Sequence, residues 1–251
     1  FDDQAPLLYL RLRIDGRSGF ETIRQAVVDE AQEYTPLQYA VMEQLFPHAM
    51  FTLLGDAGQT VLGAGSRPFT ESAPAAIRRA HPVRLNLRRS YRSTWEIARF
   101  AAALMPAAGP VEPFERHGDP PDMTGCADQA AQDEAILCRM TPYSRPGAGM
   151  AAVVCRTEKE ARETARRLQG RLPIAYIGDG AAVRPGCMAM SAFRARGLEF
   201  DAVCVADGQR FDTPVGRRLL YIACTRALHR LSVFYRGKKP AFLEGRPTED
   251  R

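Results

Sequence analysis

Two carboxylates directly after a short apolar run are the residues of this 251-residue chain that most plainly suggest chemistry. The run VVDEAQE, residues 27–33, passes from two valines into Asp29 and Glu30. A carboxylate at the end of a buried strand can hold Mg²⁺, and a second one beside it can orient or deprotonate an attacking water. A turn with two solvated surface acids is the competing interpretation, and the pair alone does not decide between them.

A second apolar run ends in the same way. MFTLL, residues 50–54, runs into Gly55 and Asp56, and Gln59 follows, where its amide could hydrogen-bond a terminal phosphate. Between the two runs, TPLQ at 35–38 predicts a helix start with a capping box. A strand, a helix and a second strand at this spacing predict a parallel pair, whose carboxyl ends bring the acids to one edge.

The rest of the chain predicts alternating strands and helices, with a division between about residues 62 and 82. Strands are expected at 23–28, 83–87, 151–156, 173–178, 187–192, 201–206 and 231–235. Helices are expected at about 94–104, 127–140, 158–168 and 215–228, with a linker at 63–75 and a loop at 106–125. This order is typical of an α/β protein with parallel strands.

Composition narrows the setting of the protein. The net charge is +5, and nearly all of the positively charged side chains are arginines. This composition fits a nucleic-acid partner, but it also fits codon bias towards Ala, Arg, Gly and Pro. None of the six cysteines forms a CxxC pair, and most lie in apolar runs, so we expect buried free thiols and a cytoplasmic location. No run approaches the roughly 20 apolar residues of a membrane helix, so no membrane partner is expected. The first residues do not look like a signal peptide, and they lack an initiating Met, which indicates a piece of a longer chain.

Five segments in chain order resemble the successive ATPase motifs of superfamily 1 helicases of the UvrD/Rep class. They are VVDEAQE, LLGDAGQT, LNLRRSYRST, MSAFRARGLEFDAV and LLYIACTRALHRL, spanning residues 27–231. The text around them is similar to the HelD or helicase-IV-like branch. The resemblance implies a RecA-like P-loop NTPase fold, a parallel sheet flanked by helices. Residues 1–75 would belong to the first RecA-like domain, and residues 76–251 would form the second.

The resemblance also implies ATP and Mg²⁺ as cofactors and gives the nucleotide site its residues. Asp29 would bind the metal with ATP, and Glu30 would activate the hydrolytic water. Gln59 would contact the γ-phosphate. Arg92 and Arg226 would reach the same phosphate from the second domain as arginine fingers.

Four further residues take their roles from the same resemblance. Glu199, which follows Gly197 in the RGLEF segment, would contact the nucleotide sugar. Ser191 and Phe193 fall where the family contacts single-stranded DNA. A phenylalanine there could stack on a base, and packing of its ring in the core is the alternative.

One family feature is missing from the chain. It contains no GxxxxGK[ST] loop, and no lysine precedes residue 159, so nothing in these residues cradles the β- and γ-phosphates. The resemblance therefore implies the C-terminal motor portion of an ATP-dependent DNA helicase or translocase that moves on single-stranded DNA. The 251 residues alone are expected to hydrolyse no ATP. The alternative is a non-catalytic interaction module of a HelD-like factor that recycles RNA polymerase.

Overall fold

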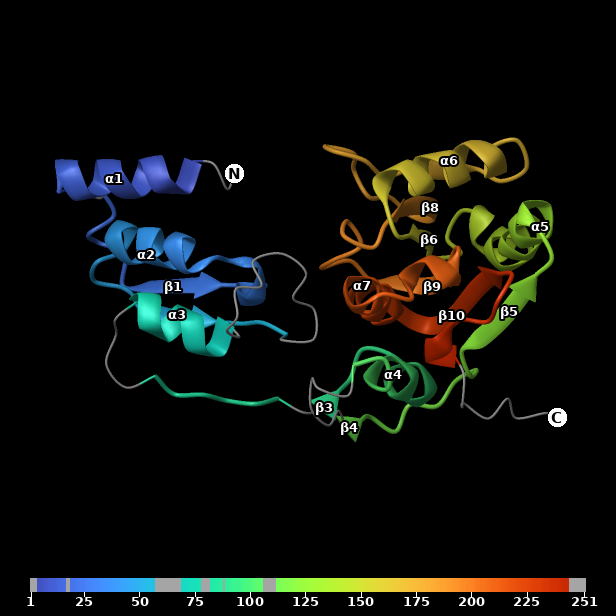
Figure 1. The fold of residues 1–251 in the computed structure, drawn as a ribbon, viewed down its shortest axis with the longest axis horizontal. Coiled ribbons are helices and arrows are strands. Elements are labelled where there is room, and N and C mark those ends of the chain that lie inside the picture. The colour runs from blue at the N-terminus through green and yellow to red at the C-terminus, as the bar shows by residue number, and fades with distance from the viewer. Residues whose placement is uncertain are drawn as a thin grey trace. The chain divides into compact units, whose positions relative to one another are not determined.

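The chain forms two compact units, Phe1–Asn86 and Leu87–Arg251 (Figure 1). The computed structural model describes residues 4–16, 19–56, 69–77, 82–87, 89–105 and 112–243. Among these residues, no helix is long and apolar enough to cross a membrane. Each unit has its own parallel sheet.

The first unit is built around a two-stranded parallel sheet. Strands β1 (Gln25–Val28) and β2 (Met50–Leu53) pair so that Val28 lies opposite Leu53. Helix α2 (Pro36–Leu45) connects them, after the short 3-10 helix η2 (Ala31–Glu33). The capping box predicted at the start of α2 is confirmed, because the Thr35 and Gln38 side chains each accept the other's backbone N–H. The strand–helix–strand prediction is therefore correct.

Two more helices belong to this unit, and the sequence did not predict either. Helix α1 (Ala5–Asp15) begins four residues into the chain, and α3 (Phe69–Ile77) lies where we expected a linker over 63–75. Ala73 and Ile77 are one helical turn apart and pack against Tyr39, so burial outweighs the poor helix propensity of Pro74. Residues 63–68 lie outside the described residues.

The prediction of a strand at 83–87 is wrong. Residues 82–87 form no strand and pair with no described strand, and Val83, Leu85 and Leu87 are 85%, 81% and 93% exposed. An alternating apolar pattern predicts a side-chain arrangement, but a strand also needs a neighbouring edge with free N–H and C=O groups.

The second unit contains a six-stranded parallel sheet in the order β5-β10-β9-β6-β8-β7. Its strands are β5 (Asp122–Cys126), β6 (Met150–Cys155), β7 (Ile174–Tyr176), β8 (Gly186–Ser191), β9 (Phe200–Val205) and β10 (Ala227–Arg236). A separate short pair, β3 (Arg89–Ser90) and β4 (Glu112–Pro113), precedes them. The predicted fold class, a parallel sheet flanked by helices, is confirmed.

Helices cover both faces of this sheet. Side chains of α5 (Gln129–Met140) and α6 (Glu158–Leu168) pack with Ala151, Val153 and Cys155 of β6. Ala152 and Val154 point to the opposite face and are equally buried. Helices α4 (Trp95–Ala102) and α7 (Pro214–Cys224) contact β10 and β9. The 3-10 helices η5 (Thr141–Ser144), η6 (Gly208–Phe211) and η7 (Ala241–Leu243) complete the elements.

Two boundaries in this unit differ from the prediction. Part of the loop expected at 106–125 is strand β5, because Asp122-Met-Thr-Gly-Cys has no apolar run and becomes a strand only through pairing with β10. The helix expected to reach 228 ends at Cys224, and β10 already begins at Ala227. Residues 225–226 are therefore a tight connection between α7 and β10.

The prediction of free thiols is confirmed. All six cysteines are free, and five of them are buried, with Cys138 as the exposed one. Burial raises the pKa of Cys187 to about 11 and that of Cys204 to about 12. These thiols stay protonated and unreactive near neutral pH.

Candidate functional site

The predicted acids follow the carboxyl end of β1. Asp29 is exposed and Glu30 is half-buried, and the Glu30 N–H donates to Asp29 Oδ1 at 2.8 Å. The loop is tied to β2 by the backbone, since Ala31 N donates to Leu54 O and Leu54 N to Val28 O, each at 2.8 Å. The acids therefore stand at the edge where parallel sheets place their ligands.

Glu30 has an unusual backbone. Its φ is 50° and its ψ 40°, and it shares a positive φ with only one other non-glycine among the described residues, Asp207. The left-handed region costs an L-residue about 1–2 kcal/mol. Residues held in such conformations are concentrated at functional sites, where the surrounding contacts over-determine them.

Gln32 holds Glu30 in place. Its side chain is buried, 2% exposed, and its Nε2 donates to Glu30 Oε2 at 2.6 Å. Its Oε1 accepts the backbone N–H of Asp56 at 3.0 Å. Gln32 therefore links the acid after β1 to the acid after β2. Gln32 was not among the predicted site residues, although a glutamine two residues after the second acid of DEAQ was the available indication.

Tyr39 of helix α2 anchors this loop through a hydrogen bond. Its hydroxyl donates to the carbonyl oxygen of Ala31, and burial raises its pKa well above the ordinary tyrosine value. The hydroxyl therefore remains a donor at any physiological pH. Helix α2 thereby fixes the backbone between Glu30 and Gln32.

Asp29 and Glu30 could bind a magnesium ion only if water or phosphate oxygens supplied the other ligands. The Asp29 carboxylate is exposed and accepts the Glu30 N–H at Oδ1, so its other lone pairs can bind a cation. Within the part of the chain that the structure describes, no three His, Cys, Asp or Glu side chains gather into a metal site. Mg²⁺ is commonly held by one or two carboxylates plus water and phosphate oxygens, so the residues fit that mode. Gln59 lies outside the described residues.

In the second unit, three predicted residues meet at the amino ends of β9 and β10. Arg92 Nε lies 2.6 Å from Glu199 Oε1. Glu199 directly precedes β9 and Arg226 directly precedes β10, and Phe200 N donates to Arg226 O at 2.9 Å. Residues that lie more than a hundred positions apart in the sequence are thus neighbours at one edge.

Arg116 fixes the loop that carries Arg92. Its Nη2 donates to the carbonyl oxygen of Arg92 and, at 3.4 Å, to that of Leu228. Beside Arg92, the Tyr91 ring is 61% exposed and lies 5.2 Å from the Phe114 ring, centroid to centroid. Neither Arg116 nor Tyr91 was among the predicted site residues. An aromatic directly before Arg92 was an available indication for Tyr91, whereas nothing near Arg116 pointed to its contacts.

Arg92 and Arg226 differ in accessibility. The Arg92 side chain is 44% exposed, whereas Arg226 is 1% exposed and its Nη2 lies 3.2 Å from Thr225 Oγ1. A buried arginine of this kind supports the fold around it as well as any ligand. Arg92 is therefore the guanidinium of the two that a ligand can reach directly.

Ser191, the last residue of β8, and Phe193, two residues further, lie at the opposite edge, at the carboxyl end of β8. The Ser191 hydroxyl is buried and donates to Glu158 Oε1 at 2.6 Å. Phe193 is 46% exposed, and the Arg196 guanidinium lies 4.0 Å from its ring centroid. The structure thus places the Phe193 ring at the surface rather than in the core. Gly197, with φ +69°, makes the left-handed turn that leads towards Glu199.

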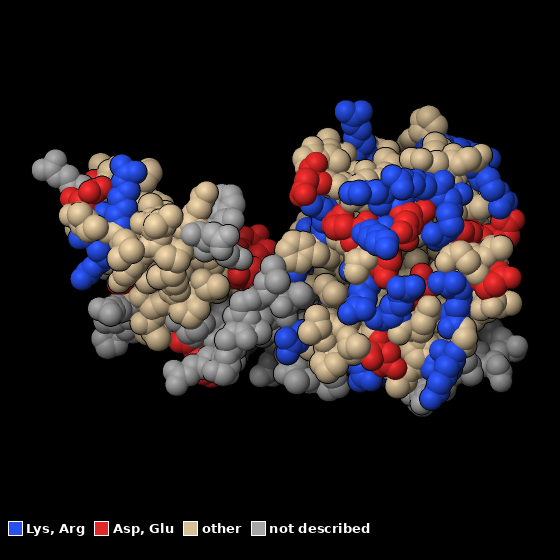
Figure 2. All heavy atoms as spheres, turned by 45° about the horizontal axis from the view of Figure 1, so that its top comes forward, with Lys and Arg blue, Asp and Glu red and all other residues tan. Residues whose placement is uncertain are grey.

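Surface charge alone does not mark a nucleic-acid surface on this unit. Figure 2 shows Lys and Arg side chains interspersed with Asp and Glu over the larger unit. Several arginines are paired with neighbouring acids, including Arg194 with Glu158 and Arg210 with Glu160, each at 2.9 Å. The positive charge of the composition is therefore partly neutralised locally.

Comparisons with known proteins identify the class that the chain resembles. Residues 186–234 match the UvrD-like helicase C-terminal domain, and this stretch contains five of the predicted site residues, namely Ser191, Phe193, Gly197, Glu199 and Arg226. The C-terminal domain of a possible DNA helicase from Lactobacillus plantarum WCFS1 has a TM-score of 0.51 at 25% identity, covering 62% of this chain and 92% of that chain. The chain is thus similar to helicases of superfamily 1, and its fold is RecA-like.

More distant structures also match. An arterivirus nonstructural protein 10 helicase in complex with DNA gives a TM-score of 0.45 at 16% identity over 84% of this chain and 39% of that chain. Cas3 from T. fusca with AMPPNP gives 0.46 at 15% identity over 86% and 30%. No curated protein sequence matches the chain.

Proposed function

We propose that the chain is the C-terminal motor portion of an ATP-dependent superfamily 1 DNA helicase or translocase of the HelD-like branch, which couples ATP hydrolysis to movement on single-stranded DNA. One observation carries the proposal: a pair of acids beyond a parallel strand, the second strained and held by a buried glutamine. The match over residues 186–234 and the likeness to a helicase C-terminal domain support the class.

The two acids divide the chemistry between them. Asp29, with its exposed carboxylate, would hold Mg²⁺ together with phosphate oxygens, and the ion would neutralise charge that develops during phosphoryl transfer. Glu30 would orient the attacking water and accept its proton. Gln32 would keep the Glu30 carboxylate in one position, because its amide donates to one carboxylate oxygen and leaves the other for the water.

Arg92 and Glu199 suggest how nucleotide binding could be sensed. Arg92 Nε and Glu199 Oε1 pair with each other, at 2.6 Å. If Arg92 contacts the γ-phosphate and Glu199 accepts from a ribose hydroxyl, this ion pair must break. Both side chains are nearly half exposed, so the exchange costs no more than about 1 kcal/mol. Arg226 would contribute from its buried position beside them.

The single-stranded DNA would be contacted at the other edge. Phe193 offers an exposed ring on which a base can stack, with Arg196 adding positive charge. The Ser191 hydroxyl is engaged by Glu158, so Ser191 would position this loop.

The test uses the full-length protein that contains this segment. Glu30→Gln is expected to lower single-stranded-DNA-stimulated ATP turnover at least about 100-fold while ATP still binds. Glu43→Gln, a half-buried acid of α2, serves as the control and should leave turnover unchanged. Equal turnover for Glu30→Gln and the unaltered protein would refute the proposal.

Two further measurements separate the alternatives. The 251 residues alone should hydrolyse no ATP, because they contain no GxxxxGK[ST] loop. If the full-length protein is also inactive, and this chain alone captures RNA polymerase in a pull-down, the non-catalytic interaction module replaces the motor.

A further inference from the structure

One carboxylate joins the ends of three neighbouring strands at the edge that carries Phe193. Glu158 is the first residue of α6 and follows β6 after a two-residue connection. Its Oε1 accepts a hydrogen bond from the Ser191 hydroxyl at 2.6 Å, and its Oε2 accepts one from the Tyr176 hydroxyl at 2.7 Å. Ser191 and Tyr176 are the last residues of β8 and β7, so the Glu158 carboxylate links the carboxyl ends of β6, β8 and β7.

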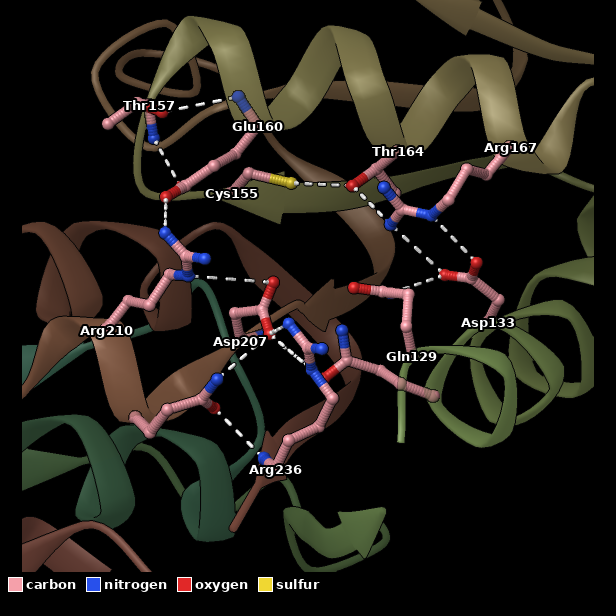
Figure 3. Close-up of polar contacts among 12 residues, drawn as sticks. Gln129, Asp133, Cys155, Thr157, Glu160, Thr164, Arg167, Asp207, Arg210 and Arg236 are labelled. Atoms are coloured by element: carbon pink, nitrogen blue, oxygen red, sulfur yellow. Dashed lines mark hydrogen bonds and ion pairs between the residues drawn. The ribbon is translucent and has the colours of Figure 1, made fainter. Parts of the chain in front are cut away.

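The start of helix α6 does not depend on this carboxylate. The Thr157 and Glu160 side chains already form the capping box, and Figure 3 shows Glu160 bonded to Thr157 and directed at Arg210. An acid in the first turn of a helix interacts favourably with the helix dipole, but that interaction needs no contact with other strands. The contacts of Glu158 with β7 and β8 therefore have a different purpose.

A third contact connects Glu158 to the turn after β8. Arg194 Nε lies 2.9 Å from Glu158 Oε1, and the same guanidinium also pairs with Asp179. The side chains of Arg194 and Glu158 are 27% and 40% exposed, so the pair is partly shielded from water. Because two acids neutralise the Arg194 guanidinium, it has little positive charge to offer a DNA phosphate.

Phe193 lies between the two residues that Glu158 holds. The Ser191 carbonyl oxygen accepts the backbone N–H groups of Arg194 and Ala195, each at 3.1 Å, and Ser191 Oγ accepts the Arg194 N–H at 3.3 Å. The turn is thus closed on both sides of Phe193, whose side chain is 46% exposed. An aromatic ring on a turn that is already ordered can bind without a further loss of conformational entropy.

We propose that Glu158 is a positioning residue for single-stranded DNA: by holding Ser191 and Arg194, its carboxylate fixes the turn that presents the Phe193 ring to a base. The inference rests on the proposed function, in which a base stacks on Phe193. The turn recognises a base rather than a phosphate, because it offers an exposed ring beside a guanidinium that is already neutralised. Glu158 acts through the turn and not by contact with DNA.

The test compares two fluorescein-labelled strands of equal length, an oligothymidylate and an abasic oligonucleotide, binding to the 251-residue chain. Fluorescence anisotropy gives the two dissociation constants, and their ratio, abasic over thymidylate, measures the preference for bases. Stacking requires a base, whereas phosphate contacts occur with both strands, so the ratio cancels the effect of removing a negative charge. Glu158→Gln is expected to lower the ratio at least about fivefold, the smallest effect that loss of one stacked base should have.

Three variants make the result specific. Glu163→Gln removes the same charge from an exposed position of α6 and should leave the ratio unchanged. Phe193→Ala should lower the ratio about as much as Glu158→Gln, and the two changes together should lower it no further. Glu158→Asp keeps the charge but withdraws the carboxylate from its partners, so it should also lower the ratio, and it replaces Glu158→Gln if that variant does not fold.

The outcomes separate this inference from the proposed function. If Phe193→Ala lowers the ratio and the folded Glu158 variants do not, the positioning role is overturned and the DNA contact of Phe193 stands. Equal losses of affinity for both strands in the Glu158 variants would indicate a general structural role and would also overturn the inference. A ratio that Phe193→Ala leaves unchanged, or a chain that binds neither strand, would refute the proposed DNA contact together with the inference.

Discussion

Replacing Gln32 by leucine tests whether the strained acid is held in place by a side chain. The substitution removes a hydrogen bond to the Glu30 carboxylate and leaves the Asp56 N–H without its acceptor. A hydrogen bond to a charged group contributes about 1.5–3 kcal/mol, and a stranded buried donor costs about 1–3 kcal/mol. Glu30 is half-buried, so water replaces part of the loss. We expect a net local cost of about 2 kcal/mol, or about 30-fold in the local opening equilibrium.

Hydrogen exchange measured by mass spectrometry reports on this opening. The amides of Ala31, Leu54 and Asp56, whose hydrogen bonds close the loop, should exchange about 30-fold faster in Gln32→Leu. Gln44→Leu, the same change at a half-buried position of α2, is the control and should leave these amides unchanged. Exchange rates within threefold of the unaltered protein would show that the backbone alone maintains the loop.

Three further predictions concern the second unit. Burial would raise the pKa of Asp207, but hydrogen bonds led by Arg236 outweigh it and hold that pKa below its ordinary value of 3.8. The stabilisation is therefore complete above about pH 4 and is lost as the pH falls through the folded value, and Asp207→Asn should remove this slope from acid unfolding curves. Arg92→Ala should cost less than about 1 kcal/mol of stability, because its pair with Glu199 is half exposed. The same change should lower ATP turnover of the full-length protein about 1,000-fold. A loss of ATP turnover no larger than the loss of stability explains would contradict the role of Arg92. Cys138 should react with a thiol reagent in the native protein, whereas the five buried cysteines should react only on unfolding.

Local chemistry made much of the fold predictable. Thr35 and Gln38 predicted a capped helix start from four residues, because a capping box depends only on local geometry. The apolar runs around Val153 and Val203 predicted strands, since strands buried on both faces have continuous apolar sequence. These elements need no knowledge of their partners.

Elements that depend on distant partners were not predictable. Strand β5 contains a glycine and one methionine and becomes a strand because β10 lies beside it. The opposite failure occurred at 83–87, where the apolar alternation is present and no described strand pairs with it. Pairing, which the sequence does not record locally, decided both cases.

The same limit applies to the candidate site. The sequence segments predicted which residues belong to the site, namely Asp29, Glu30, Arg92, Glu199 and Arg226. They did not predict the contacts of these residues, because the ion pair of Arg92 with Glu199 joins residues far apart in the chain. The burial of Arg226 likewise follows from the packing of α7 against the sheet. Gln32 lay inside a quoted segment and still received no role, since its value lies in reaching Asp56.

The loops after β1 and β9 show why register matters more than sequence identity. DEAQ at 29–32 and ADGQ at 206–209 share only the glutamine at equivalent positions, and the two segments invite no comparison as text. Each segment nevertheless has a positive φ at its second residue, and each is hydrogen-bonded through its glutamine to the residue three positions after the paired residue of the neighbouring strand. Because the donor of that anchor is a main-chain N–H, this hydrogen bond does not depend on which side chain the donor residue carries. In the first unit this position holds the carboxylate of Asp56, whereas in the second unit it holds Arg236, whose guanidinium donates to the Asp207 carboxylate.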